Sequence, residues 1–169
     1  MDTSEADLFI AANDGDCGRM LALLDRGAEA DESDEMVGGK TAGGKTIQSN
    51  ALIQAAWKNR QEAINLLLDH RADPNCANSN GMTPLMMAAQ EGHLPIVKTL
   101  LQHDDAAINA IDMGNYSAFH LACFYANTDC ALILAKHGCD MTLRNDNGET
   151  GKEMAEKKGR SAPPRTRSC

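Results

Sequence analysis

Aromatic residues are scarce in this chain, where one Trp, two Tyr and three Phe make up 4% of 169 residues. Long apolar runs are lacking as well, since none approaches the roughly 18 consecutive residues of a membrane-spanning helix. With so few rings, a core has to be built from alanine, leucine and methionine, which favour helices. These shortages argue against a membrane protein and against an all-β sandwich. The length leaves room for one domain.

Basic residues are also in deficit, with 16 against 24 acidic residues and a net charge of −8. The first 35 residues contain 11 of the acidic residues, and all 24 precede Lys157. Because an acidic surface repels the phosphate backbone, we expect no nucleic-acid partner. The same surface favours a protein partner that carries basic residues.

The start of the chain does not resemble a signal peptide, because residues 1–7 are acidic and contain no apolar segment. We therefore expect a cytoplasmic protein. The nucleus is the alternative compartment, given the basic residues that follow Glu156. In either compartment the six cysteines are expected to be thiols rather than a disulfide framework.

What the chain does contain is an internal repeat of 33 or 34 residues. Leu52, Leu85, Phe119 and Lys152 occupy the same place in successive units, and Leu8 precedes Leu52 by 44 residues. Pairs of small residues recur in phase, namely Ala11-Ala12, Ala55-Ala56, Ala88-Ala89 and Ala122-Cys123. Leucine-rich pairs recur in the same way, namely Leu23-Leu24, Leu67-Leu68, Leu100-Leu101 and Leu134-Ala135. This spacing predicts two short helices per unit, with eleven residues inserted after the first unit.

Local signals mark where these helices begin and end. Pro84 suits a first helical position, where no amide donor is needed, and Thr83 before it can cap the free amides. The units end near Gly27, Ala72 and Gly138. At these places we expect glycine or a small residue in the left-handed conformation.

Together these motifs resemble the ankyrin repeat. The closest matches to the family's T-P-L-H and G-A-D-x-N signatures are Thr83-Pro84-Leu85 and Arg71-Ala72-Asp73-Pro74-Asn75. The resemblance covers about residues 5–158. It implies an all-α solenoid of stacked helix-turn-helix units joined by β-turns, whose turns and first helices form a concave binding face. It also implies a protein-protein interaction module rather than an enzyme.

On this basis the chain divides into an ankyrin-repeat domain, 1–158, and a disordered basic tail, 159–169. The domain comprises units at about 5–30, 48–77, 78–111 and 112–144, a capping half unit at 145–158, and an insertion loop at 31–47. His120 is the only histidine at the family's motif position, and Met86 takes that place in the unit before. We therefore expect a weaker polar network between turns at Met86.

Residues 39–46 spell G-x-x-x-x-G-K-[ST], which is the pattern of a phosphate-binding loop. A working loop of this kind leaves a buried apolar strand, yet residues 31–37 contain only two apolar side chains. We therefore interpret the segment as part of a mobile insertion. The alternative function is that of a small nucleotide- or phosphate-binding protein using residues 39–46.

Five potential metal ligands fall within twenty positions of each other: His120, Cys123, Cys130, His137 and Cys139. They contain no C-x-x-C pair, and each has a place in the repeat, so we expect no metal site. Acidic, hydroxyl and imidazole side chains likewise recur with the repeat and do not converge on one pocket. We expect no catalytic residues and no cofactor.

Candidate binding residues follow from the resemblance. In ankyrin-like units, the two residues before the G-H motif and those beside the turn face outward on the concave side. The predicted contact surface consists of Trp57, Lys58, Gln90, Glu91, Tyr116, Phe124 and Tyr125. Because aromatic residues dominate binding energetics, we expect a monomer that uses this surface to bind a protein with basic residues around an apolar anchor. The alternative is that Trp57 and Phe124 fold back over helix ends.

Overall fold

A computed structural model describes residues 4–28, 33–34, 49–103 and 106–161. Its helices are α1 (Ser4–Asp14), α2 (Cys17–Asp25), α3 (Ala51–Trp57), α4 (Gln61–Asp69), α5 (Pro84–Glu91), α6 (Leu94–Leu101), α7 (Ala118–Phe124), α8 (Thr128–Lys136) and α9 (Gly151–Ser161). A two-residue antiparallel pair, β1 (Ser33–Asp34) and β2 (Ser49–Asn50), accompanies them. In the described part of the chain, no helix is long and apolar enough to cross a bilayer.

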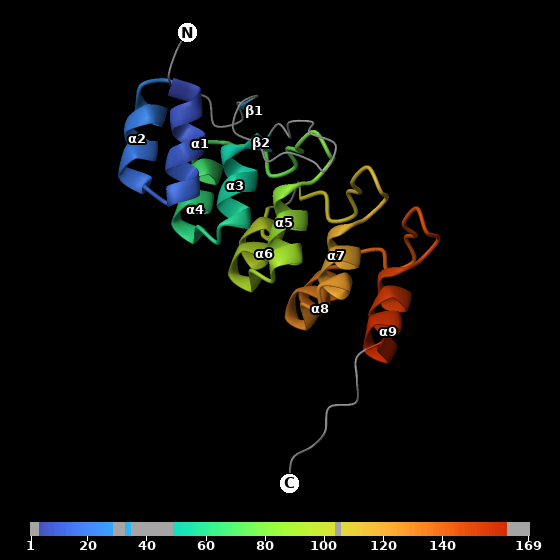
Figure 1. Ribbon diagram of the computed structural model, residues 1–169. Helices are drawn as coiled ribbons and strands as arrows, with labels where there is room; N and C mark the ends of the chain where they lie inside the picture. Colours follow the sequence, from blue (N-terminus) through green and yellow to red (C-terminus); the bar gives the residue numbers. More distant parts are fainter. Residues whose placement is uncertain (1–3, 29–32, 35–48, 104–105, 162–169) are drawn as a thin grey trace.

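The helices are stacked as antiparallel pairs, which confirms the predicted all-α solenoid (Figure 1). The first helices, α1, α3, α5, α7 and α9, pack on one another in order, and so do the second helices, α2, α4, α6 and α8. The turns between units project to one side of the stack (Figure 1). The stack therefore has a first-helix face, formed by the first helices, and a second-helix face on the other side.

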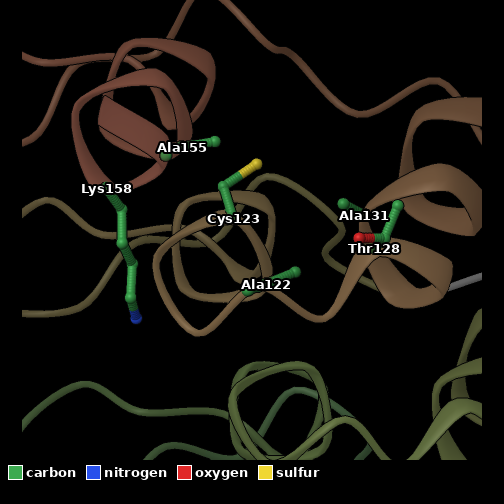
Figure 2. A pocket seen from close by; sticks show the side chains of 8 residues that line it. Ala122, Cys123, Thr128, Ala131, Ala155 and Lys158 are labelled. Atoms are coloured by element: carbon green, nitrogen blue, oxygen red, sulfur yellow. The ribbon is translucent and has the colours of Figure 1, made fainter. Parts of the chain in front are cut away.

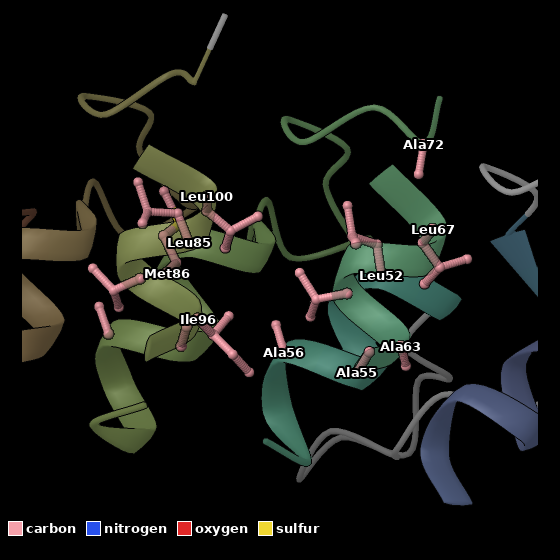
Figure 3. Close-up of a cluster of buried hydrophobic side chains, with 14 of the residues drawn as sticks. Leu52, Ala55, Ala56, Ala63, Leu67, Ala72, Leu85, Met86, Ile96 and Leu100 are labelled. Atoms are coloured by element: carbon pink, nitrogen blue, oxygen red, sulfur yellow. The ribbon is translucent and has the colours of Figure 1, made fainter. Parts of the chain in front are cut away.

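Small side chains allow the first helices to approach one another closely. In the small pairs, every alanine is at most 1% exposed. Figure 3 shows Ala56 on α3 and Ile96 on α6 directed into the space between two successive helix pairs. Leu67, Leu100 and Leu134 complete the same layer from the second helices and are likewise at most 1% exposed. The core is one continuous layer that runs through the four full units.

Capping residues begin the first helices at equivalent places in the repeat. The caps are Asn50, Thr83, Ser117 and Thr150. Each side-chain oxygen accepts the backbone N–H three residues later, at 3.0–3.4 Å. The predicted start of α5 at Pro84, after Thr83, is therefore confirmed.

The turns before these helices share one arrangement. Asn78, Asp112 and Asn145 each use a side-chain oxygen to accept backbone N–H groups two and four residues later, at 2.8–3.0 Å. Neighbouring turns are joined through the backbone, because Met113 N donates to Asn80 O at 3.0 Å, and an equivalent bond follows one unit later. The loops are thus fixed relative to one another without a β-sheet.

His120 adds a polar link between units. Its Nδ1 accepts the Ser117 N–H at 3.2 Å and lies 2.9 Å from Ser117 Oγ. Its Nε2 lies 3.2 Å from Glu149 O in the next turn, and a carbonyl oxygen can only accept, so Nε2 carries the proton. The histidine therefore ties α7 to the capping half unit. Met86 in the unit before is 1% exposed and cannot form such a bond.

Three features of the chain differ from the sequence-based expectations. In the second unit the left-handed residue is Arg71, with φ 65°, rather than Ala72. Helix α9 continues to Ser161, so residues 159–161, assigned to the disordered tail, are helical. Ser33 and Asp34, assigned to the insertion loop, pair with β2 and so bring the two ends of the insertion together. The rest of the tail and most of the insertion lie outside the described residues.

The close packing of α9 on α7 predicts opposite effects at two glycines of α9. A Cβ on Gly151 would lie 2.8 Å from Phe119 Cδ1, whereas a Cβ on Gly159 would meet no atom of the described chain within 4 Å. We expect Gly151→Ala to lower the free energy of unfolding by about 1–2 kcal/mol through overpacking. Gly159→Ala is the matched control and should raise it by about 0.5 kcal/mol. Urea unfolding measures both. Equal effects of the two substitutions would show that α9 does not pack closely on α7.

The left-handed conformation of Arg71 predicts that a glycine at this position stabilises the chain. A left-handed conformation at a residue with a Cβ costs about 1 kcal/mol, and Gly27 and Gly138 occupy the equivalent positions without that cost. We expect Arg71→Gly to raise the free energy of unfolding by about 0.5–1 kcal/mol. His70→Gly, at a neighbouring position with φ −89°, should lower it. If Arg71→Gly were destabilising in thermal unfolding, the strain would not be present.

Candidate functional site

The predicted contact surface lies mainly at the C-terminal ends of three successive first helices. Trp57 is the last residue of α3, Glu91 the last of α5 and Phe124 the last of α7. Lys58 and Tyr125 are the residues that cap α3 and α7. Trp57, Gln90 and Phe124 occupy equivalent positions of the repeat and form one row across the stack. Lys58, Glu91 and Tyr125 form a parallel row beside it.

Trp57 is exposed, and the ammonium group of Lys58 lies over its ring. The residue is 41% exposed. Lys58 Nζ lies 3.8 Å from the centre of the Trp57 ring, within cation–π range. On the next first helix, Gln90 Nε2 donates to Glu91 Oε1 at 2.9 Å. This end of the surface therefore presents an ammonium group and a carboxylate beside one large ring.

A second aromatic cluster lies at the end of α7. Phe124 and Tyr125 are 45% and 47% exposed, and their rings pack edge to face at 5.1 Å. Lys158 on α9 places its Nζ 4.8 Å from the centre of the Phe124 ring and 5.7 Å from that of Tyr125. The same ammonium group donates to Phe124 O. The cap helix thus holds a positive charge over both rings.

Tyr116 lies apart from the row of helix ends. Its ring packs edge-on against His120 at 6.2 Å, and its hydroxyl accepts from Asn147 Nδ2 at 3.5 Å. Tyr116 and Phe124 both line a cavity of about 580 Å³ between α7 and α9, which we call the cap pocket. Tyr116 therefore belongs with the second aromatic cluster and not with Trp57.

Side chains from the following unit fix the ends of the first helices. Arg60 Nε donates to Asn13 O at 3.1 Å, and His93 Nε2 donates to Trp57 O at 3.1 Å. Asn127 Nδ2 donates to the carbonyls of Ala89 and Gln90 at 2.9 and 2.6 Å. The backbone beneath the contact surface is therefore held by the unit after it.

The cap lysines are the residues that the sequence interpretation missed. The two rows of the predicted surface continue at the repeat spacing, because Lys157 lies 33 residues after Phe124 and Lys158 lies 33 after Tyr125. Both lysines fall in the capping half unit, 145–158, into which the two rows were not followed. Following the rows into that unit places both lysines beside the rings.

A second hollow, of about 470 Å³, opens between α7, α8 and α9. Figure 2 shows Cys123 on α7 pointing into the space between Ala155 on α9 and Ala131 on α8. Burial, with a smaller contribution from Cys139, raises the pKa of the Cys123 thiol to about 11. Burial also raises the pKa values of Cys130 and Cys139. These thiols are weak nucleophiles at neutral pH.

Two further hypotheses concern metal and phosphate binding. Among the described residues, no group of three or more His, Cys, Asp and Glu side chains is placed to hold a metal ion. His120, Cys130 and Cys139 are buried at separate places in the helical stack. The phosphate-loop pattern at 39–46 lies outside the described residues, and so does Cys169.

Comparison with known proteins shows which protein family has this repeat. A family model described as "Ankyrin repeats (3 copies)" matches residues 52–145. The chain is 31% identical over 129 residues to SH3 and multiple ankyrin repeat domains protein 2 from Homo sapiens, a match that covers 73% of this chain and 7% of that protein.

Other relatives share the repeat within different proteins. Neurogenic locus notch homolog protein 1 from Mus musculus is 30% identical over 149 residues, which is 88% of this chain and 5% of that protein. Probable E3 ubiquitin-protein ligase XBOS32 from Oryza sativa subsp. japonica is 30% identical over 131 residues, 77% of this chain and 25% of that protein. The chain thus spans a quarter or less of the length of these relatives.

The raised pKa of the half-buried Cys123 thiol predicts a slow and pH-dependent modification. With a pKa of about 11, only about one Cys123 thiol in a thousand is ionised at pH 8. We expect iodoacetamide to modify Cys123 about a hundredfold more slowly than N-acetylcysteine at pH 8, with the rate rising as pH approaches 11. Peptide mass spectrometry measures the rate for this one residue. Modification as fast as that of the free thiol at pH 8 would contradict the assigned burial.

Proposed function

Because this chain belongs to the ankyrin-repeat family, we propose that it is a non-enzymatic protein-protein interaction module of the adaptor, scaffold or inhibitor type. Ankyrin repeats are a generic protein-interaction module, and we place the partner on the first-helix face. The observation that carries this proposal is the set of exposed aromatic rings at the ends of α3 and α7, namely Trp57, Phe124 and Tyr125.

Exposed rings on fixed backbone are suited to binding. Trp57, Phe124 and Tyr125 would each bury a large apolar area against a partner, and rings of this kind are enriched among residues that dominate interface energetics. The donors from the next unit hold the backbone at Trp57 and Gln90, so little of it has to become ordered on binding. Preorganisation of this kind raises affinity.

The charges around the surface support a protein partner with basic groups near its apolar anchor. Asp14 at the end of α1 and Glu91 at the end of α5 are exposed in the row of helix ends. The chain as a whole is acidic, with a net charge of −8. Basic side chains of a partner would pair with these carboxylates and speed the encounter.

The titratable groups support a non-enzymatic role. Hydrogen bonds from Thr142 lower the pKa of the Asp140 carboxyl in a turn. The Thr150 backbone amide, which donates to Glu153, is the largest cause of the lowered pKa of that carboxyl. Both shifts stabilise the charged form in a turn or helix cap, which is the opposite of what a general acid needs.

The proposal predicts that binding fails while folding persists when an exposed ring is removed. We expect Trp57→Ala or Tyr125→Ala to weaken binding by about 2 kcal/mol, roughly thirtyfold, with little change in melting temperature. Affinity capture with mass spectrometry supplies the partner, and calorimetry with the purified pair measures its affinity.

Leu132→Ala is the matched control. Leu132 is 55% exposed, and it lies on α8, a second helix that is not part of the predicted contact surface. It should bind like the unaltered chain. A ring variant that unfolds would show that the ring supports the core. Unchanged affinity in both ring variants would place the contact elsewhere, with the 31–47 insertion as the next segment to test.

A further inference from the structure

The burial pattern of the repeat breaks at the hollow between α7, α8 and α9. We call it the Cys123 hollow, and Cys123, Thr128, Ala131 and Ala155 are among the residues that line it (Figure 2). Cys123 and Ala131 are half-buried. The residues at their equivalent positions in the three earlier units are all 0% exposed, namely Ala12, Ala56 and Ala89 for Cys123, and Met20, Ile64 and Val97 for Ala131.

The unit that follows accounts for this difference. Met20 is buried although no helix precedes α1 in the described chain, so the cover at this position comes from the unit after it. The second helices pack on one another in turn, α2 on α4, α4 on α6 and α6 on α8. Within the described residues, no second helix accompanies α9. The Cys123 hollow therefore continues the second-helix layer beyond α8.

The second helices of the chain show which apolar side chains suit this layer. Each of α4 and α6 buries two adjacent residues and a leucine four positions after the first of them. In α4 these are Ala63-Ile64 and Leu67, and in α6 they are Ile96-Val97 and Leu100. A short helix with this pattern is therefore complementary to the second helix before it.

A polar contact accompanies the apolar ones. Gln61 Nε2 on α4 donates to Thr99 Oγ1 on α6 at 2.9 Å. Thr128 on α8 is equivalent to Gln61, and it is exposed at the Cys123 hollow. Its hydroxyl is therefore placed for the same kind of contact with a helix in the hollow.

We propose that the Cys123 hollow binds an amphipathic helix of a partner protein, seated as the next member of the second-helix layer. The helix carries an apolar pair, a leucine four positions after the first member of that pair, and a polar residue immediately before the leucine. The apolar residues pack on Cys123, Ala131 and Ala155, and the polar residue forms a hydrogen bond with Thr128. The hollow shares no residue with the predicted contact surface, so this site goes beyond the proposed function.

Two other occupants suit the hollow less well. A folded second copy has no second helix to offer, because Leu67, Leu100 and Leu134 are each at most 1% exposed within their own stack. Residues 162–169 contain two adjacent prolines and no leucine, isoleucine or valine, so they lack the pattern. Lys158 also lines the hollow, but its ammonium group donates to Phe124 O, so the occupant needs no carboxylate to pair with it.

The probe for this proposal is a synthetic peptide with the sequence of residues 93–103, which contains α6. An isolated helix of this length is marginal in water, so a lactam bridge joins Lys98 to a glutamate introduced by Gln102→Glu. Both positions are exposed in the chain. We expect saturable binding to the unaltered full chain, with amide chemical-shift changes at Cys123, Thr128 and Ala131. The same peptide with Leu100→Asp should not bind, because its carboxylate would be buried without a partner.

Variants of the chain locate the site. Ala155→Glu places a charged side chain in the hollow and should weaken the peptide about tenfold. Ala22→Glu on α2 is the matched control, since Ala22 is also exposed on a helix, and it should bind like the unaltered chain. Thr128→Val should weaken binding about fivefold, and it should not weaken further a peptide with Thr99→Val, which lacks the same hydrogen bond. Circular dichroism checks that each variant remains folded.

The remaining outcomes decide between occupants. No saturable binding, or equal binding to Ala155→Glu, would overturn the proposal. Tighter binding after deletion of residues 162–169 would assign the hollow to this chain's own end, and a dimer that the peptide dissociates would assign it to a second copy. Either result would also overturn the proposal. Trp57→Ala should bind the peptide like the unaltered chain, so a failure at the Cys123 hollow is distinguishable from a failure of the proposed function.

Discussion

The structure depends on how closely successive first helices can approach. One helix pair has a single layer of side chains and cannot enclose a core, so each unit is stable only against its neighbours. The alanine pairs, at most 1% exposed, leave room for that contact, and the leucines of the second helices fill the remaining space. Gly151 extends the rule to the cap, where a Cβ would come within 2.8 Å of the Phe119 ring. Any larger residue at these places would separate the units and open the core between them.

The same constraint generates the contact surface. Helices that stack in register bring equivalent positions of the repeat side by side, so the residues at these positions lie in rows whatever their chemistry. Arg60, His93 and Asn127, at equivalent positions, reach back to carbonyls of the preceding unit, and these hydrogen bonds hold the row. The fold therefore supplies a rigid line of positions, and the side chains placed on it decide what it binds. This is why relatives with the same repeat occur within proteins of different name and length.

Much of this could be predicted from the sequence, because the repeat ties each local signal to a position. The small pairs, the cap at Thr83 and the helix pairs follow from spacing and local chemistry. Arg71 could not be predicted as the left-handed residue from local preference, since packing of the flanking helices overrides the cost of its Cβ. The pairing of β1 with β2 joins residues on either side of an insertion and has no periodic signal. The contact of Lys158 with the rings of Phe124 and Tyr125 was not predicted, because the expected contact surface ended at α7 and did not include the capping half unit.

The capping half unit shows how a departure from the repeat changes the charge beside the aromatic residues at the end of α7. In the units before it, the equivalents of Lys157 and Lys158 are Asn13 and Asp14, Trp57 and Lys58, Gln90 and Glu91, or Phe124 and Tyr125. The one ammonium group among them, on Lys58, lies over a ring of its own unit, whereas that of Lys158 lies over rings of the previous unit. Nor does a second helix follow α9 within the described residues, so the end of α7 is covered by one helix where earlier units provide two. The hollows on either side of α9 are the result. A terminal unit has to present a polar outer face to water. Lys158 belongs to that face, and its ammonium group also lies over the rings of Phe124 and Tyr125.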